Sequence, residues 1–230
     1  METSVIVIAY NEEKDIRDCI GAILNQTIKD FELIVVDDGS TDCTGKIVLS
    51  FKDPRIKYFK SKKNQGYASA RNKGIKHSKG KFIFFTDADC VPKSDWLYQG
   101  LKKIKESETI AVVGGKTYFP RTGSSYSASD RVTFEKTYFP PPKRNIASTS
   151  NLVYRRSILE RVSGFNTRYN DGSEDTDMRL RISRLSGFLL KHNSRMIVYH
   201  KFKSMQLNEA LSIIKRMSNH VLLIKDHKDH

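Results

Sequence analysis

The chain has 230 residues, which is long enough to bury a sizeable core, and its 40 Lys and Arg outnumber its 26 Asp and Glu to give a net charge of +14. This surplus suits an anionic partner, but the basic residues are spread along the chain and form no separate nucleic-acid-binding arm. The three cysteines show no C-x-x-C spacing, which argues against a disulfide framework and against a zinc site, so a reducing setting is expected.

The first residues show no secretion signal. The apolar run from Val5 to Ala9 is short, and no basic region precedes it. No stretch approaches the roughly 20 apolar residues that a membrane span requires. We therefore expect a cytoplasmic protein that is soluble or peripheral at the cytoplasmic face of the membrane.

Short apolar runs alternate with helical stripes along the first half of the chain. The predicted strands cover residues 4–9, 31–36, 56–59, 82–85 and 110–113. The predicted helices carry the apolar stripes Ile16 to Leu24 and Ile47 to Phe51, and cover residues 68–77 and 95–104. This alternation predicts an α/β fold, with a mostly parallel central sheet flanked by helices.

The second half has a different texture. Residues 120–145 hold four of the six prolines, a composition typical of a lid or binding loop, and we expect a mobile acceptor-side loop there. Further on we predict a strand at 151–154, a helix at 156–162, a helix from Gly172 to about Ser186, and a last strand at 196–199. An apolar stripe over residues 207–224 predicts a C-terminal amphipathic helix, which either packs on the sheet or meets an anionic membrane surface.

Polar clusters follow several predicted strands. They are residues 9–12, residues 37–40, the pair Asp87 and Asp89, and the acidic start of the helix at 174–177. Because the carboxyl ends of parallel strands meet at one edge of a sheet, we expect the first three clusters to share a site. Taken alone, Asp87-Ala-Asp89 fits a turn with two solvated acids better than a metal site.

The residue types suit a nucleotide held by acids and metal. Carboxylates accept hydrogen bonds from a base or from ribose hydroxyls, and two aspartates can hold Mg²⁺ or Mn²⁺ against a diphosphate. Arg71, behind Gly66 at the start of its helix, is placed to approach the same phosphates. No P-loop occurs, and no G-x-G-x-x-G follows the first strand.

Five ordered segments resemble the family 2 glycosyltransferases of the GT-A fold. They are Val5-Ile-Val-Ile-Ala-Tyr-Asn-Glu-Glu13, Ile34-Val-Val-Asp-Asp-Gly-Ser-Thr-Asp42, Asn64-Gln-Gly-Tyr-Ala-Ser-Ala-Arg-Asn-Lys-Gly74, Asp87-Ala-Asp89 and Gly172-Ser-Glu-Asp-Thr-Asp177. The resemblance covers about residues 4–200. It implies a Rossmann-like GT-A domain and an inverting transfer from a nucleotide diphosphate sugar, with a UDP-sugar as the favoured donor.

The resemblance also implies roles for single residues. Asp38 is similar to the residue that contacts the base, Asp87 and Asp89 to the metal and diphosphate motif, and Asp175 to the general base. His200 resembles a third metal ligand, although a solvated surface histidine fits it equally well. Together the clusters and the resemblance place the nucleotide sugar against Ala9, Tyr10, Asn11, Glu12, Asp38, Gly66, Arg71, Asp87 and Ala88.

Two further residues are expected on the acceptor side. Glu174 precedes the implied base, and both acids also fit an ordinary helix start. Trp96 lies on a helical stripe, so it forms either part of the core or a wall for the acceptor.

The expected organisation follows from these motifs. A GT-A domain of residues 1–204 would divide into a nucleotide-binding half, 1–115, and an acceptor-binding half, 116–204, followed by the helix at 205–230. Processive relatives carry a Gln-x-x-Arg-Trp signature and membrane spans, and the sole tryptophan, Trp96, lies elsewhere. We therefore expect transfer of a single sugar to a glycan, lipid-linked or protein acceptor.

Two other functions fit the sequence less well. A sugar nucleotidyltransferase would carry a Gly- and Arg-rich loop after the first strand, and residues 9–14 contain no glycine. A nucleic-acid-binding protein is suggested only by the net charge.

Overall fold

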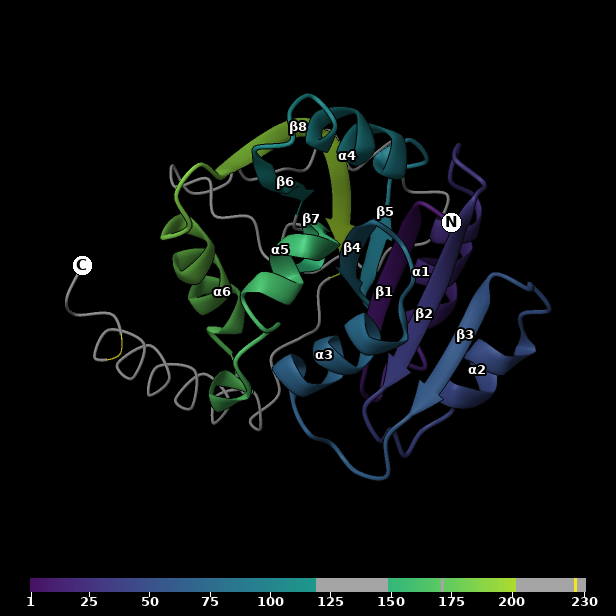
Figure 1. Ribbon diagram of the computed structural model, residues 1–230. Coiled ribbons are helices and arrows are strands. Elements are labelled where there is room, and N and C mark those ends of the chain that lie inside the picture. The colour runs from purple at the N-terminus through teal and green to yellow at the C-terminus, as the bar shows by residue number, and fades with distance from the viewer. Residues whose placement is uncertain (119–148, 171, 202–225, 227–230) are drawn as a thin grey trace.

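The computed structural model describes residues 1–118, 149–170, 172–201 and 226 (Figure 1). Its strands form one sheet in the order β3-β2-β1-β4-β7-β6-β8-β5. The strands are β1 (Thr3–Ala9), β2 (Phe31–Asp37), β3 (Ile56–Lys60), β4 (Phe82–Asp87), β5 (Cys90–Pro92), β6 (Ile110–Tyr118), β7 (Leu152–Arg155) and β8 (Leu189–His200). The helices are α1 (Ile16–Leu24), α2 (Thr44–Ser50), α3 (Tyr67–His77), α4 (Trp96–Ile104), α5 (Arg156–Arg161) and α6 (Glu174–Ser183).

The first four strands form a parallel half-sheet. β1 lies in the middle and pairs in parallel with both β2 and β4, while β2 pairs in parallel with β3. Every residue of β1 and β2 is buried, as expected for strands covered on both faces. The α/β architecture with a mostly parallel sheet flanked by helices is therefore confirmed.

Two apolar cores lie on opposite faces of this sheet. Val5 and Val7 of β1 join one core, and Ile6 and Ile8 join the other, because successive strand residues point to opposite faces. Helices α1, α2 and α4 contribute to the first core, and α3, α5 and α6 to the second.

The second half of the sheet is mixed. β7 runs antiparallel to β4 and to β6, β6 pairs in parallel with β8, and β8 runs antiparallel to β5. β8 begins at Leu189, well before the predicted start at residue 196. After its first two leucines the added segment is polar, and it is exposed or only partly buried, so it shows no strand pattern in the sequence. β5 was not predicted, since a three-residue strand that contains Pro92 carries no periodic signal.

Helix α6 is shorter than expected. α6 starts at Glu174 and ends at Ser183, and the residue before it, Ser173, has a left-handed backbone with φ of 72°. A residue in that conformation cannot continue a right-handed helix, so the helix begins immediately after it.

Some expectations fall outside the described residues. These are the acceptor-side loop at 120–145 and the amphipathic helix at 207–224. Asp226 is described, and its carboxylate accepts a hydrogen bond from the Tyr169 hydroxyl at 2.6 Å and pairs with Arg168 at 3.1 Å. Within the described part of the chain, no helix has the length and apolarity to cross a membrane.

Candidate active site

The carboxyl ends of β1, β2 and β4 meet at one edge of the sheet. The strand register pairs Ala9 with Asp37 across β1 and β2, and Ile8 with Asp87 across β1 and β4. The three polar clusters that follow these strands are thereby brought together, as the sequence predicted. This edge is where open α/β sheets bind their ligands.

Asp37 and Asp38 are adjacent in the chain but have different surroundings. Asp37 is fully buried, and its carboxylate accepts hydrogen bonds from the Ser40 amide at 2.7 Å and the Tyr58 hydroxyl at 2.5 Å. Burial, together with the hydrogen bond to Asp37, raises the pKa of Tyr58, so that hydroxyl stays a donor. Asp37 therefore stabilises the loop after β2.

Asp38 is held by only one of its oxygens. Its Oδ2 accepts hydrogen bonds from the backbone amides of Gln65 and Gly66, each at 2.8 Å. Its Oδ1 is buried and has no hydrogen-bond partner among the residues that the structure describes. Because a buried polar atom is costly to leave unpaired, this oxygen suits a donor group on a ligand.

The loop after β1 is fastened to the loop after β2. The amide of Asn11 donates to the Ser40 hydroxyl at 3.0 Å, and the amide of Glu12 donates to the Thr44 hydroxyl at 2.7 Å. Asn11 itself has a positive φ of 56°, a conformation that asparagine tolerates better than most residues. Tyr10 is left exposed at the rim.

Gly66 brings the start of α3 against the segment that precedes α6. Its φ is +89°, and a Cβ there would lie 2.6 Å from the Asn170 carbonyl oxygen. Asn170 also accepts hydrogen bonds from the Tyr67 amide, through its carbonyl, and from the Ser69 amide, through its side chain, both at 2.9 Å. Asn170 carries no signal in the sequence, because its role depends on a contact between distant segments.

Arg71 joins the two halves of the site. Its side chain is buried, and its guanidinium forms one ion pair with Glu174 at the start of α6 and another, at 3.2 Å, with Asp87 at the end of β4. Burial lowers the pKa of Arg71, but the charges of Glu174, Asp87 and Asp175 raise it by more, so the guanidinium stays charged. Arg71 thus holds α6, which carries the expected general base Asp175, beside the end of β4, where Asp87 lies.

Asp175 lies next to this buried pair. It is half-buried, and its Oδ1 accepts a hydrogen bond from the Thr176 amide at 2.7 Å. Its charge contributes to the raised pKa of Tyr154, after the larger effect of burial. The Asp175 carboxylate is therefore fixed by its own helix, close to the ends of the strands.

The two residues expected on the acceptor side lie in the interior. Trp96 has no exposed surface, stacks edge-on against Phe84, and donates its indole N–H to Asn151 at 2.8 Å. Glu174 is only 5% exposed and faces Arg71. We correct the acceptor-side expectation for both residues, because neither side chain is accessible to an acceptor.

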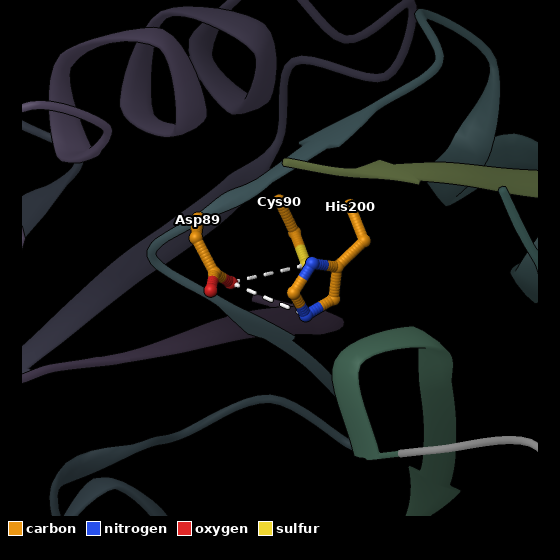
Figure 2. A group of neighbouring side chains, drawn as sticks. All are labelled: Asp89, Cys90 and His200. Carbon is orange, nitrogen blue, oxygen red and sulfur yellow. Dashed lines mark hydrogen bonds and ion pairs between the residues drawn. The ribbon is translucent and has the colours of Figure 1, made fainter. Parts of the chain in front are cut away.

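Asp89, Cys90 and His200 form a second cluster beside Asp87 (Figure 2). Their ligand atoms all lie within 4.8 Å of one another, and His200 Nε2 is 3.7 Å from Asp89 Oδ1. Asp89 and His200 therefore fit a divalent cation as they stand, whereas Asp87 is engaged by Arg71. Burial raises the pKa of Asp87, Arg71 opposes this, and Asp89 adds to it, with an upward net direction.

Lys201 supports this cluster, although the sequence did not predict a role for it. Its amide donates to the Asp89 carbonyl at 2.8 Å, and its ammonium group pairs with Asp15 at 3.1 Å and with Asp18 at 2.6 Å. The end of β8 is thereby tied both to α1 and to the turn after β4. One lysine among the many basic residues of this chain shows no sequence pattern that predicts this role.

Comparisons with known proteins identify the family of the chain. A profile described as "Glycosyl transferase family 2" matches residues 4–163. The glycosyltransferase AglE of Haloferax volcanii is 33% identical over 177 residues, which cover 74% of this chain and 58% of that protein. The glycosyltransferase GlyA of Streptococcus pneumoniae is 31% identical over 214 residues, covering 85% of this chain and 30% of that protein. The chain thus spans less than two thirds of the length of these relatives.

Solved structures share the fold. TarS 1–349 of S. aureus, in complex with UDP-GlcNAc, superposes with a TM-score of 0.69 at 22% identity, covering 90% of this chain and 60% of that one. The mannosyltransferase PcManGT from Pyrobaculum calidifontis, in complex with GDP-Man and Mn²⁺, gives 0.68 at 25% identity, covering 86% and 56%. With the sheet, the ordered strand-end clusters and a family profile over most of its length, the chain belongs to glycosyl transferase family 2.

Proposed function

We propose that this protein transfers a single sugar, with inversion, from a nucleotide diphosphate sugar to a hydroxyl group of an acceptor. The observation that carries the proposal is the position of Arg71, which pairs with Asp87 and with Glu174. This pairing brings the strand ends that suit a nucleotide next to Asp175, the residue that suits a general base.

Asp38 supports a nucleotide at the edge of the sheet. Its Oδ2 is anchored by two backbone amides, and its Oδ1 lacks a partner within the described residues. A single acceptor oxygen matches the single imide N–H of uracil, whereas guanine presents two neighbouring donors. We therefore propose a UDP-sugar as the donor.

Asp175 is the proposed base. An acceptor hydroxyl has a pKa far above 7, so a carboxylate must take its proton as the oxygen attacks the anomeric carbon. The oxygen attacks opposite the leaving diphosphate, which inverts the configuration. The hydrogen bond from the Thr176 amide holds the Asp175 carboxylate at the start of α6, where this step needs it.

A divalent cation would be held by Asp89 and His200, with Asp87 beside them. When bound, Mn²⁺ or Mg²⁺ would stabilise the negative charge on the leaving diphosphate. The residues of the chain supply the remainder of the site. Arg71 orients Asp87 and Glu174, and Asp38 orients the nucleobase of the donor.

The acceptor is proposed from charge alone. A net charge of +14 suits a glycan or lipid-linked acceptor on an anionic membrane surface, reached from the cytoplasm. Such a protein would serve glycan or polysaccharide biosynthesis at that surface.

The first test is a thermal-shift panel of UDP-, GDP- and dTDP-sugars, each with Mn²⁺, followed by an assay for nucleotide release. We expect a UDP-sugar to raise the melting temperature. If no nucleotide sugar of the panel raises the melting temperature, even with Mn²⁺ present, the proposal is contradicted.

The base is tested by Asp175→Asn. The amide can still accept the hydrogen bond from Thr176 but cannot take a proton, so we expect transfer to fall by about 10²-fold or more while donor binding and the fold persist. The control is Thr176→Val, which removes the hydroxyl that donates to Asp175 Oδ1 at 3.3 Å but keeps the carboxylate and the amide that holds it, and it should retain most of the transfer activity. Transfer that survives in Asp175→Asn at the wild-type rate would assign the base elsewhere.

A further inference from the structure

Strand pairing sets a thiol beside the proposed metal ligands. β5 and β8 run antiparallel, and their register places Cys90 directly opposite His200, with Asp89 as the residue before Cys90. Side chains of directly opposed residues point to the same face of a sheet and lie close together. Figure 2 shows all three side chains turned toward one another.

The distances suit one small ion. Cys90 Sγ lies 3.6 Å and His200 Nε2 lies 3.7 Å from Asp89 Oδ1. A zinc ion with bonds of about 2.3 Å to sulfur and about 2.0 Å to nitrogen and oxygen separates its tetrahedral ligands by about 3.3–3.6 Å. Two of the three separations are therefore already close to the required values, and the third is below 4.8 Å.

The histidine is oriented as a metal ligand. His200 Nδ1 lies 2.7 Å from the Lys201 carbonyl oxygen, which can only accept, so Nδ1 carries the proton and donates it. Nε2 is then the ring nitrogen left for an ion, and it lies 3.7 Å from Asp89 Oδ1. A backbone carbonyl that fixes the second ring nitrogen is a common partner of histidines that bind metals.

Sulfur changes which ion the cluster prefers. Mg²⁺ and Mn²⁺ are best bound by oxygen ligands, whereas thiolate selects softer ions such as Zn²⁺ and Cd²⁺. We propose that Asp89, Cys90 and His200 form a binding site for a thiophilic divalent cation. On binding, the S–H bond of Cys90 breaks, a sulfur–metal bond forms, and the proton leaves to solvent.

The site goes beyond the proposed transferase and does not depend on it. It shares Asp89 and His200 with the proposed site for Mn²⁺ or Mg²⁺, so a thiophilic ion would compete with those ions. Cys90 itself has no exposed surface, but the side chains of Asp89 and His200 are 15% and 27% exposed, and an ion would enter past them.

The test is a titration of the purified protein with Cd²⁺ alone, followed by the ultraviolet charge-transfer absorption of a cadmium–thiolate bond. All proteins carry Cys43→Ser, because Cys43 is an exposed thiol that would bind Cd²⁺ on its own. We expect the band to saturate at a single equivalent in this parent. It should be lost in Cys90→Ser, whose hydroxyl keeps a hydrogen-bonding group but is a poor ligand for a soft ion.

The matched control is Cys19→Ser. Cys19 is also a buried thiol, and its Sγ donates to the Asp87 carbonyl at 3.4 Å. We expect this variant to keep the band. A band that is absent in the parent, survives in Cys90→Ser, or disappears in Cys19→Ser would overturn the proposal.

A second variant keeps the test decisive if Cys90→Ser does not fold. His200→Gln leaves the buried thiol in place and alters a side chain that is partly exposed, and it should weaken Cd²⁺ binding by at least about tenfold. Unchanged affinity in His200→Gln would overturn the three-ligand site. Neither measurement uses nucleotide or acceptor, so either proposal can fail while the other stands.

Discussion

Arg71 shows at the scale of single residues how the site is held together. One buried guanidinium serves Asp87, which ends a strand, and Glu174, which begins a helix 103 residues away. Burial raises the pKa of Glu174, Arg71 lowers it, and the charge of Asp175 raises it, with an upward net direction. The carboxylate of Glu174 therefore depends on Arg71 to remain charged.

We predict that Arg71→Met destabilises the protein by about 3–5 kcal/mol, because it leaves two carboxylates without their counter-charge. The double variant with Glu174→Gln should recover part of this loss, since one of the stranded charges is then removed. Urea unfolding of the two single variants and the double variant at pH 7 measures the coupling. Strictly additive losses would mean that the two side chains do not interact.

Glu32 is a second buried acid, far from the site. It accepts hydrogen bonds from the Ser4 hydroxyl, the Lys57 ammonium group and the Lys79 amide, each at 2.6 Å. Burial raises the pKa of Glu32, but the bonds from Lys57, Ser4 and Lys79 lower it by more, so the net shift is downward. Its contribution to stability is complete above the ordinary carboxyl pKa and is lost as the pH falls through the lowered value.

The corresponding prediction concerns Glu32→Gln. The variant should be less stable than the wild type by about 2 kcal/mol at pH 7, and the difference should shrink as the solution becomes more acidic than about pH 4. Urea unfolding across this range measures it. Glu106→Gln, at an exposed residue paired with Lys103, is the control and should change stability little at either pH. If the stability difference between Glu32→Gln and the wild type grows on acidification, the pKa of Glu32 is not lowered in the folded protein.

At the scale of elements, Gln26 connects two helices on one face of the sheet. Its side-chain amide donates to the carbonyls of Ala22 at 3.1 Å and Lys93 at 2.8 Å, and its carbonyl accepts from the Leu97 amide at 3.0 Å. The end of α1 is thereby joined to the start of α4, which carries Trp96 into the core.

We predict that Gln26→Ala destabilises the protein by about 3 kcal/mol, because backbone groups at both helices lose their buried partner. Thermal or urea unfolding would measure the loss. Gln99→Ala is the matched control. Among the described residues the Gln99 side chain bonds to Asp95, the N-cap of its own helix, and this bond should contribute about 0.5 kcal/mol or less. Equal losses in the two variants would show that Gln26 does not connect the helices.

The elements also show what sequence patterns can predict. β1, β2 and β4 are continuous apolar runs with polar residues at their ends, so both the strands and the convergence of Asp37, Asp38 and Asp87 followed from the sequence. The mixed half did not, because the direction of β7 and the pairing of β5 with β8 depend on contacts between distant segments.

The same limit applies to the site. The ordered motifs and the family resemblance that they carry pointed to Asp38, Asp87, Asp89 and Asp175, but not to which oxygen of Asp38 is anchored. Arg71 was expected to approach phosphates, and its two carboxylate partners depend on how α6 packs against α3. The sequence did not predict Cys90 as a metal ligand, because that role depends on the strand register that places it opposite His200.

At the scale of the whole molecule, one sheet runs through both predicted halves. The parallel strands continue through β4 into β7, β6 and β8, and Trp96 contacts Phe84 on one side and Asn151 on the other. Trp96 is the only tryptophan in the chain, so its fluorescence reports on this junction.

We predict that residues 1–115 and 116–204 do not unfold separately. Denaturant curves followed by Trp96 fluorescence and by far-ultraviolet circular dichroism should coincide, as in a cooperative two-state transition. Two distinct midpoints would show that the nucleotide-binding and acceptor-binding halves melt independently.

The pairing of β5 with β8 has a consequence for how the chain folds. β1 to β4 are joined by short crossovers and can assemble from nearby residues, whereas Cys90 and His200 come from strands about 110 residues apart. Closing the loop between these two strands lowers the entropy of the chain before any stabilising contact between them has formed. We therefore expect the corner with Asp89 and His200 to form late, so a newly made chain would have its strand-end carboxylates in place before it could bind an ion.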